Sequence, residues 1–556
     1  MSAEAVREGP GREPGALQWP HWLPWAGLGL AGVVLVAHSL IYNFVTDDAY
    51  ISFVYSRNFA EHGELAFNLG DAVEGYTNFS WTVLLGVLMK LGIAPEYSSR
   101  VLGTLCALGT LAVVTRTMQR VVADRNSPYV VLPALVLACS SGFACWTSGG
   151  LETQLFTLLV AAAVDGVVAS ATDPRALRRA GWLLALASMT RPEGPLIAAM
   201  LGIARMTYFL TAWLASRKTE HPRPWLGFPL RDELIAAGYF LVLWAPWFAW
   251  RWWYYGYPFP NTYYVKAAGP WSNPRLAGEM VDNGYYYIWV WLKQTKVLYA
   301  SPIIVAGLLL ARARTPRFVL VDACNMLALF YVPYAISVGG DFMGLHRFIM
   351  PLFVIAAIGL ALGLERIATR HALAGAGLAG LVVIGFAITQ VMLTRDSVRE
   401  GNTRPDRGID TPAFLIVYTE DRAKIGRAME ACFHPDDFSI VGGAGAQPYF
   451  GRMRSIDVFG LVSDKIAHRE PRIRARAGHT KWGSERLLAE YDPTFVFACY
   501  EIHRTPVTPT LPCGGYWRAQ GFEQVTVKVP GLRERGEYYT FLAKKSRNFQ
   551  CPSRVH

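Results

Sequence analysis

The sequence predicts a polytopic α-helical membrane protein that carries a soluble α/β domain after its last membrane helix. Two observations support this fold class. The 556 residues are 52% hydrophobic and only 17% charged, whereas ordinary soluble proteins carry about 25% charge. Apolar runs of spanning or near-spanning length recur through residues 22–394 and stop near residue 395. A bilayer needs about 20 apolar residues per helix, so we predict a membrane domain over 22–394 and a soluble domain over 395–556.

The N-terminus is predicted to be a polar cytoplasmic tail over residues 1–21, followed by an uncleaved first helix at about 22–44. No small-residue cleavage site follows this first run, which argues against a signal peptide. Further apolar runs bring the expected number of membrane helices to about eleven. They lie near 100–118, 128–146, 151–170, 181–190, 195–213, 234–253, 290–311, 317–338, 348–364 and 371–393. The interrupted runs 181–190 and 195–213 are interpreted as a shallow hairpin.

The basic residues decide the expected orientation. The net charge of +11 resides largely in short loops between apolar runs, as the positive-inside rule requires, so the charge does not indicate nucleic-acid binding. All of these loops are cytoplasmic if residues 80–94 do not cross the membrane. That segment contains Lys90 and is short for a span. We therefore predict a juxtamembrane helix in the first outer loop, a cytoplasmic N-terminus and an extracytoplasmic C-terminal domain.

The C-terminal region, 395–556, is polar and contains short strand-like stretches at 414–418, 494–498 and 524–529, separated by Gly and Pro turns. It also contains Cys432, Cys499, Cys513 and Cys551. On the predicted topology these cysteines lie in an oxidising compartment, where disulfides form, and four cysteines allow three pairings. Their spacing fits no zinc site.

Six unusual polar segments fall on the same outer side of this topology. Charged groups at helix ends are costly to desolvate unless they are paired or functional, so the set indicates the rim of a cavity. The segments are TDDAYIS (46–52), VEGYTNF (73–79), SGGLET (148–153), TRPEG (190–194), YPFPNTYYVK (257–266) and GGDFMGLHR (339–347).

Asp47 and Asp48 are the candidate catalytic residues. Two adjacent carboxylates at the membrane interface repel each other, which raises one pKa toward a value suited to a general base. A sugar hydroxyl needs such a base, and a leaving phosphate needs nearby cations. The alternative interpretation is that the pair caps the following helix. Candidate cations are Arg191, Lys266, His346 and Arg347.

Simpler interpretations also exist for the other segments. Glu152 could open a helix, where the helix dipole favours acidic residues. Arg191 and Glu193 could pair only with each other. Asn261, between Pro260 and Thr262, could be a turn residue. The aromatic stretch 244–257 fits an interfacial belt as well as a sugar platform.

The combination of segments resembles the GT-C superfamily of polyprenyl-phosphate-sugar glycosyltransferases. Within it, the chain looks most like the mycobacterial terminal β-(1→2) arabinofuranosyltransferases and their bacterial relatives. The resemblance covers most of residues 40–500 and rests on the order and spacing of the segments. It is carried by DDAYISFVYSRNFAEHGELAFN, VEGYTNFSWTVLL, SGGLET, TRPEG, RWWYYGYPFPNTYYVKA, GGDFMGLHRFIMP, GGAGAQPYFGRMRSIDVFGLVSDKIAH and AGHTKW.

The resemblance implies a GT-C fold, a polyprenyl-phosphate sugar as donor, and a periplasmic glycan or glycolipid as acceptor, in a bacterial plasma membrane. It places the catalytic acid in the first outer loop, at Asp47 or Asp48. The sugar itself does not carry over, because relatives use arabinose, mannose and aminoarabinose on one scaffold. Residues expected to face donor or acceptor are Tyr50, Glu74, Tyr76, Asn78, Glu152, Arg191, Glu193, Asn261, Tyr264, Lys266, Asp341, His346 and Arg347 in the membrane domain, and Asp457, His479 and Lys481 in the outer domain.

Other function classes remain as alternatives. A transporter or flippase of the same lipid-linked sugar needs paths on both sides, whereas the polar segments crowd one side. A lipid-linked glycan polymerase or ligase would use a pyrophosphate carrier. No Gly-rich phosphate loop for a nucleotide is present. The Asp pair could hold a divalent cation, but it comes without a full ligand set, so no metal ligands are assigned. The oligomeric state is left open.

Overall fold

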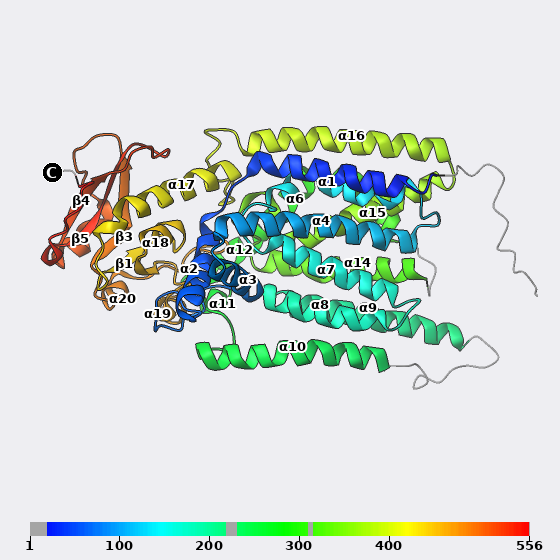
Figure 1. Ribbon diagram of the computed structural model, residues 1–556, viewed down its shortest axis with the longest axis horizontal. Coiled ribbons are helices and arrows are strands. Elements are labelled where there is room, and N and C mark those ends of the chain that lie inside the picture. Colours follow the sequence, from blue (N-terminus) through cyan, green and yellow to red (C-terminus); the bar gives the residue numbers. More distant parts are fainter. Residues whose placement is uncertain (1–18, 218–230, 310–314, 555–556) are drawn as a thin grey trace, which may run out of the picture.

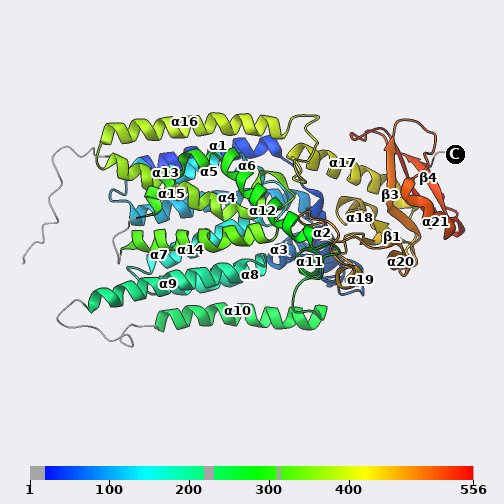
Figure 2. The ribbon, with the colours of Figure 1, turned by 180° about the vertical axis from the view of Figure 1, so that it is seen from behind.

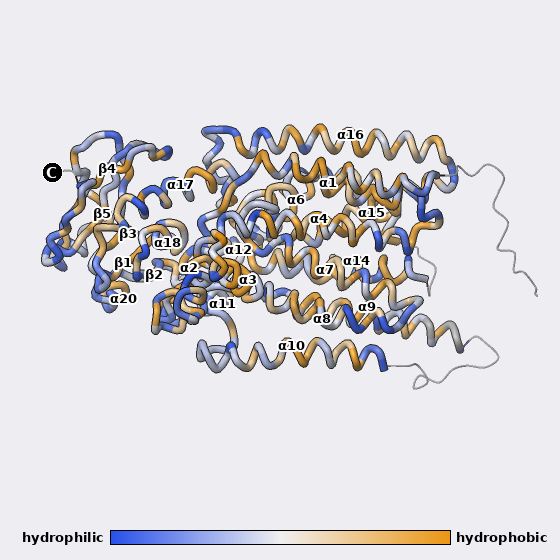
Figure 3. Tube along the Cα trace, in the orientation of Figure 1, coloured by the Kyte–Doolittle hydropathy of each residue, from blue (hydrophilic) through white to orange (hydrophobic). Residues whose placement is uncertain are grey.

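The computed structural model describes residues 19–217, 231–309 and 315–554. A bundle of long helices occupies one end of the molecule and a small sheet domain occupies the other (Figures 1 and 2). The tube coloured by hydropathy is mostly hydrophobic along the bundle and more hydrophilic in the sheet domain (Figure 3). Most of the predicted N-terminal tail, residues 1–18, lies outside the described residues.

The bundle is built from helices of both halves of the membrane domain. Among the described residues, seven helical segments are long and apolar enough to cross a bilayer: α1, α4, most of α9, α10, α14, α16, and α15 together with the short η3 before it. The helices are α1 (Leu23–Tyr42), α4 (Pro95–Val121), α5 (Leu132–Cys139), α6 (Ser141–Cys145), α7 (Thr153–Ala169), α8 (Ala176–Thr190), α9 (Gly194–Ser216), α10 (Arg231–Tyr255), α12 (Arg275–Gln294), α13 (Val297–Leu308), α14 (Pro316–Ser337), α15 (Met350–Ala368) and α16 (Ala372–Ser397), with 3-10 turns η1 (Pro128–Val130) and η3 (Gly344–Ile349).

Each of the predicted apolar runs contains helix, but two runs are broken. The run 128–146 divides into η1, α5 and α6. The single helix expected over 290–311 is wrong, because the chain turns between α12 and α13 at Lys296, whose φ is +59°. The runs expected to form a shallow hairpin instead form α8, which begins earlier at Ala176, and α9, which is long enough to span.

Three short helices lie where the bundle meets the sheet domain: α2 (Asp47–His62), α3 (Phe79–Lys90) and α11 (Asn261–Lys266) (Figure 1). α3 corresponds to the predicted juxtamembrane helix and has 12 residues. It is held against α2 by a hydrogen bond of 2.8 Å from the Ser56 hydroxyl to the Thr82 carbonyl. α2 ends at His62 and is followed by Gly63, whose φ of +78° suits the residue that terminates a helix.

The sheet domain contains five strands in the order β2-β1-β3-β5-β4. β1 pairs in parallel with β2 and β3, while β5 pairs antiparallel with β3 and β4. The strands predicted at 494–498 and 524–529 correspond to β3 and β4. The elements are β1 (Phe438–Val441), β2 (Arg454–Asp457), β3 (Phe495–His503), β4 (Phe522–Lys528), β5 (Tyr538–Lys544), α17 (Pro412–Met429), α18 (Ala446–Gly451), α19 (Asp464–Arg469), α20 (Glu485–Ala489) and α21 (Gly515–Ala519), with 3-10 turns η4 (Glu430–Cys432), η5 (Pro512–Gly514) and η6 (Lys545–Arg547).

The strand predicted at 414–418 is wrong, since these residues belong to α17. The Thr411 hydroxyl accepts a hydrogen bond from the Phe414 N–H, and Pro412 occupies the first helical position. Both features favour a helix start. Two disulfides, Cys432–Cys551 and Cys499–Cys513, select one of the three pairings that the sequence allowed.

Candidate active site

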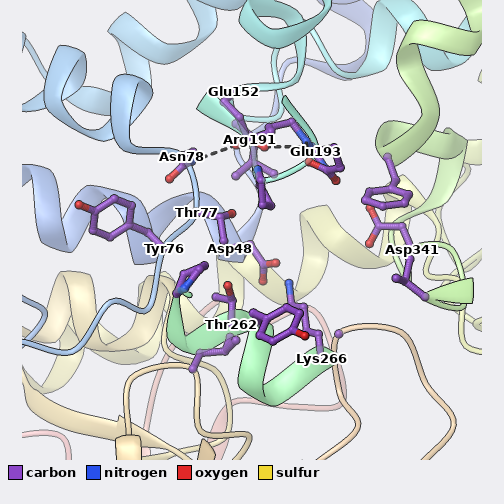
Figure 4. Close-up of a pocket in the computed structure, with 18 of the residues that line it drawn as sticks. Asp48, Tyr76, Thr77, Asn78, Glu152, Arg191, Glu193, Thr262, Lys266 and Asp341 are labelled. Carbon is purple, nitrogen blue, oxygen red and sulfur yellow. Dashed lines mark hydrogen bonds and ion pairs between the residues drawn. The ribbon is translucent and has the colours of Figure 1, made fainter. Parts of the chain in front are cut away.

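A cavity lies where the helical bundle meets the sheet domain, and all six predicted polar segments contribute to its wall. Its accessible volume is about 220 Å³. Figure 4 shows Asp48, Thr262 and Lys266 on one side of this space and the Glu152–Arg191–Glu193 group on another. Segments that are far apart in sequence therefore lie close together in space, at the wall of one cavity.

Asp47 and Asp48 point to different surroundings. The Asp47 carboxylate is buried and accepts a hydrogen bond of 2.8 Å from the backbone N–H of Ala446 in the sheet domain. Asp48 lines the cavity, and its carboxylate has no hydrogen bond or ion pair within the described part of the chain. α2 begins at Asp47, but neither carboxylate caps it; Thr46 holds the cap position without a side-chain bond. The capping interpretation therefore does not describe this pair.

The charged groups around Asp48 have opposing effects on its pKa. Burial raises the pKa of Asp48, Lys266 and Arg347 lower it, and Asp341 and Glu152 raise it. The net shift of the pKa is upward. A carboxylate with a raised pKa is a stronger proton acceptor than an ordinary aspartate once it is ionised.

Arg191 is held by carboxylates inside the cavity wall. It binds Glu152 at 3.0 Å and Glu193 at 3.0 Å, and it is buried. Asn78 donates a hydrogen bond of 2.9 Å to the other oxygen of Glu152. Because its guanidinium is enclosed between two glutamates, Arg191 is better placed to shape the wall than to receive a phosphate, the role considered for it from sequence.

The loop before α15 presents Asp341 and Arg347 to the cavity. The two side chains pair at 3.2 Å. The loop contains Gly340 at φ +72°, and a Cβ at this position would lie 2.4 Å from the Tyr287 ring, so only glycine fits. Leu345 also has a positive φ of +58°, a strained conformation of the kind found at functional sites.

Lys266, at the end of α11, differs from Arg191 and Arg347 because its ammonium group is not paired with a carboxylate among the described residues. Its side chain lines the cavity, and the ammonium group has no ion pair or hydrogen bond within the described ranges. Figure 4 shows Lys266 and Asp48 in the same part of the cavity. The site therefore contains one free carboxylate beside one free ammonium group.

Other residues predicted from the membrane domain lie outside the cavity and support it. Tyr50 packs on Tyr449 and Phe450 of the sheet domain at 5.1 Å between ring centroids. Glu74 binds Arg251 of α10 at 2.8 Å. The Asn261 side-chain amide donates to the Gly460 and Leu461 carbonyls, joining α11 to the sheet domain. Tyr264 packs against His468, and the His346 Nε2 lies 2.9 Å from the Gln294 Oε1.

The three residues predicted in the sheet domain also lie outside the cavity wall. The Asp457 carboxylate accepts a hydrogen bond from the Val462 N–H, and burial raises its pKa to about 6. The His479 ring lies between Phe342 and Phe459, 4.5 Å from each, and burial lowers its pKa to about 3. The Lys481 ammonium donates to the Ala467 carbonyl.

Sequence reasoning missed several lining residues. Thr77 and Thr262 lie next to predicted residues, and their hydroxyls are ordinary sugar-binding groups. Tyr263, Tyr334 and Phe348 add aromatic surface. Thr77, Thr262 and Tyr263 lie in the polar segments that the sequence already indicates as the cavity rim, so these segments could have identified them. Tyr334 lies inside the apolar helix α14, where no local feature of the sequence distinguishes it.

No group of three or more His, Cys, Asp or Glu side chains in the described ranges is arranged as a metal site. The other cavity carboxylates, Glu152, Glu193 and Asp341, each pair with an arginine. Asp48 therefore offers the one described carboxylate in this wall without an ion pair.

Comparison with known proteins gives matches in structure. No protein-family model and no curated protein sequence matches the chain. ArnT from Cupriavidus metallidurans bound to undecaprenyl phosphate aligns with a TM-score of 0.56 at 12% identity, covering 93% of this chain and 97% of that chain. The same protein in the apo state aligns with a TM-score of 0.51 at 13% identity, covering 94% and 98%.

The chain has the GT-C glycosyltransferase fold. The archaeal oligosaccharyltransferase AglB from Archaeoglobus fulgidus, in complex with an inhibitory peptide and a dolichol-phosphate, also matches, with a TM-score of 0.47 at 9% identity over 94% of this chain and 74% of that chain. At 12% and 13% identity, the likeness to the two ArnT structures establishes the fold alone. Together with the seven long apolar helical segments among its described residues, the GT-C fold makes the chain a multi-pass membrane protein.

Proposed function

We propose that the chain is a glycosyltransferase that moves a sugar from a polyprenyl-phosphate donor to an extracytoplasmic glycan or glycolipid, with Asp48 as the general base. The observation that carries this proposal is the free Asp48 carboxylate beside the free Lys266 ammonium, in a cavity at the head of a GT-C bundle. ArnT, which shares this fold, is recorded with undecaprenyl phosphate bound.

The proposed step needs one base and one anion site. The acceptor hydroxyl loses its proton to Asp48 while its oxygen forms a bond to the anomeric carbon of the donor sugar. The bond between that carbon and the phosphate oxygen breaks, and the polyprenyl phosphate leaves with its added negative charge. Lys266 stabilises that charge, and Arg347, which also lines the cavity, adds a second cation.

The sidedness belongs to the proposal as well. Arg120, Arg178, Arg317 and Arg366 lie at helix ends on the side of the bundle away from the sheet domain. The positive-inside rule makes that end cytoplasmic. We therefore place the cavity and the sheet domain outside a bacterial plasma membrane, where a lipid-linked donor presents its sugar at the outer leaflet.

Arabinofuranose is the first sugar to test, because the sequence resembles arabinofuranosyltransferases most. Purified full-length protein is incubated with radiolabelled decaprenyl-phosphate arabinofuranose and a short arabinan, with decaprenyl-phosphate mannose and a pyrophosphate-linked sugar in parallel. EDTA is added in a matched series, which tests whether a divalent cation assists at Asp48.

We expect label to reach the glycan only from a monophosphate donor. Transfer from the pyrophosphate donor instead would favour a polymerase or ligase. Movement of the donor across vesicles without any transfer would contradict the enzyme assignment and support a flippase.

A further inference from the structure

A second cavity lies far from the candidate active site, between α8, α9 and α10 and close to the end of the bundle opposite the sheet domain. Its accessible volume is about 340 Å³. Its wall is almost entirely apolar, with residues such as Leu177, Leu184, Leu201 and Phe240. Only two charged side chains, Arg205 of α9 and Glu233 of α10, line it in the described part of the chain.

Arg205 and Glu233 form an ion pair that leaves two polar atoms unsatisfied. The Arg205 Nε lies 2.9 Å from the Glu233 Oε1. The guanidinium carbon lies 4.7 Å from the Tyr208 ring centroid and 4.8 Å from that of Phe209. Arg205 is only 6% exposed, yet its Nη1, like the Oε2 of Glu233, is buried without a hydrogen-bond partner among the described residues.

Unmet donors and acceptors of this kind are costly in an apolar setting and rare in native structures. Here the two side chains that carry this donor and this acceptor, Arg205 and Glu233, line the same apolar space. A ligand that satisfies both with charge-assisted hydrogen bonds presents an anionic acceptor and a cationic N–H donor close together. It must also carry an apolar portion that fills the rest of the cavity.

The cavity is accessible from the outside of the bundle. Met206 and Leu241 line it and are also 43% and 53% exposed. α10 forms one edge of the bundle (Figures 1 and 2), so the side chains at this opening face the surroundings of the helices. For a membrane-embedded bundle those surroundings are lipid, and this end of the bundle is the one rich in arginine.

We infer that this cavity binds a zwitterionic phospholipid with a primary-amine head group, of the phosphatidylethanolamine class. The lipid phosphate accepts a hydrogen bond from the Arg205 Nη1, and the ammonium donates one to the Glu233 Oε2. An acyl chain occupies the apolar part of the cavity. Because the ion pair and the head group are each neutral overall, binding buries no net charge.

The head-group chemistry makes the inference selective. Phosphatidylcholine has the same charges but no N–H to donate to Glu233. Phosphatidylglycerol has the phosphate and hydroxyl donors but no cation, so its hydrogen bond to Glu233 would come from a neutral group and its negative charge would be buried uncompensated. The difference amounts to one charge-assisted hydrogen bond, for which we expect a roughly tenfold preference. This site is independent of the proposed transfer reaction and would exist whatever sugar the protein uses.

The test uses native mass spectrometry of the delipidated full-length protein in detergent, with an equimolar mixture of dioleoyl phosphatidylethanolamine, phosphatidylcholine and phosphatidylglycerol. The double variant R205M/E233M removes both charges and keeps apolar volume, a replacement that buried ion pairs often tolerate without loss of stability. The matched control is Asp232→Asn, because Asp232 pairs with Arg178 at 2.7 Å and does not line the cavity.

We expect the wild type and the Asp232→Asn variant to retain one phosphatidylethanolamine in preference to the other lipids, and the double variant to lose that preference. Equal retention of phosphatidylethanolamine and phosphatidylcholine by the wild type would overturn the inference. So would a preference for phosphatidylglycerol, or an unchanged preference in a folded double variant.

Discussion

The Asp47 carboxylate accepts a hydrogen bond of 2.8 Å from the backbone N–H of Ala446, a residue 399 positions further along the chain. This contact joins the start of α2 to the start of α18. The neighbouring Asp48 lines the cavity and makes no such contact. The Asp47 carboxylate therefore attaches the helical bundle to the sheet domain, and the Asp48 carboxylate is the candidate general base.

Exchanging each aspartate separately tests that division. We expect Asp48→Asn to lower kcat by about a thousandfold, since a general base contributes roughly 10²–10⁴ to a rate. Asp47→Asn should retain most of the activity, because the amide oxygen can still accept the Ala446 hydrogen bond. Both variants are assayed by radiolabel transfer. Full activity in Asp48→Asn, or complete loss only in Asp47→Asn, would remove Asp48 from the base role.

The pH dependence of stability tests the burial of Asp47. Burial raises its pKa from 3.8 to about 6 in the folded protein. Folding therefore favours the protonated form, and stability contributed by this group falls as pH rises from about 4 through 6, by about 3 kcal/mol at most. Asp47→Asn does not ionise, so its melting temperature relative to the wild type should rise between pH 4 and pH 7. A constant difference across that range would contradict the prediction.

Lys266→Met tests the electrostatic link between Lys266 and Asp48. Lys266 lowers the pKa of Asp48, so its removal should raise that pKa. The acidic limb of the residual kcat/KM profile should move to higher pH, because the base needs more alkaline conditions to lose its proton. The maximal rate should fall as well, since the leaving phosphate loses a cation. Lys465→Met, at a partly exposed position of α19 where the ammonium pairs with Glu490, serves as the control with an unchanged profile.

Arg191→Met tests whether Arg191 holds the wall together. The substitution leaves Glu152 and Glu193 buried without their shared cation. Breaking a buried pair in this way costs about 3–5 kcal/mol, so we expect a large drop in melting temperature. Arg191→Met/Glu193→Gln should recover part of it. A variant that is inactive but as stable as the wild type would instead indicate direct contact with substrate.

The disulfides are expected to stabilise the sheet domain unequally. Cys432–Cys551 closes a separation of 119 residues and Cys499–Cys513 one of 14. The chain-entropy estimate rises from about 3 kcal/mol for a 15-residue loop to about 4.7 kcal/mol for 100 residues. The Cys432→Ser/Cys551→Ser protein should therefore melt at a lower temperature than the Cys499→Ser/Cys513→Ser protein. The reverse order in thermal unfolding would contradict this estimate.

Local patterns in the sequence predicted part of the fold well and part of it badly. Long apolar runs marked α1, α4 and α16, because a bilayer imposes a minimum length that is visible in one dimension. The stretch 414–418 is predicted as a strand but forms part of α17, because five apolar and aromatic residues fit either element. The Thr411-Pro412 start signal was the better guide.

The sequence by itself determined the class of protein, the order of its polar segments and their gathering on one side, since hydropathy and loop charge are one-dimensional properties. Only the tertiary structure decided which members of those segments share a cavity. It assigned Asp47 to Ala446 and Asp48 to the cavity, and it enclosed Arg191 while leaving Lys266 free. Neighbouring residues on a helix face different directions, and partners hundreds of positions away decide which charges are neutralised.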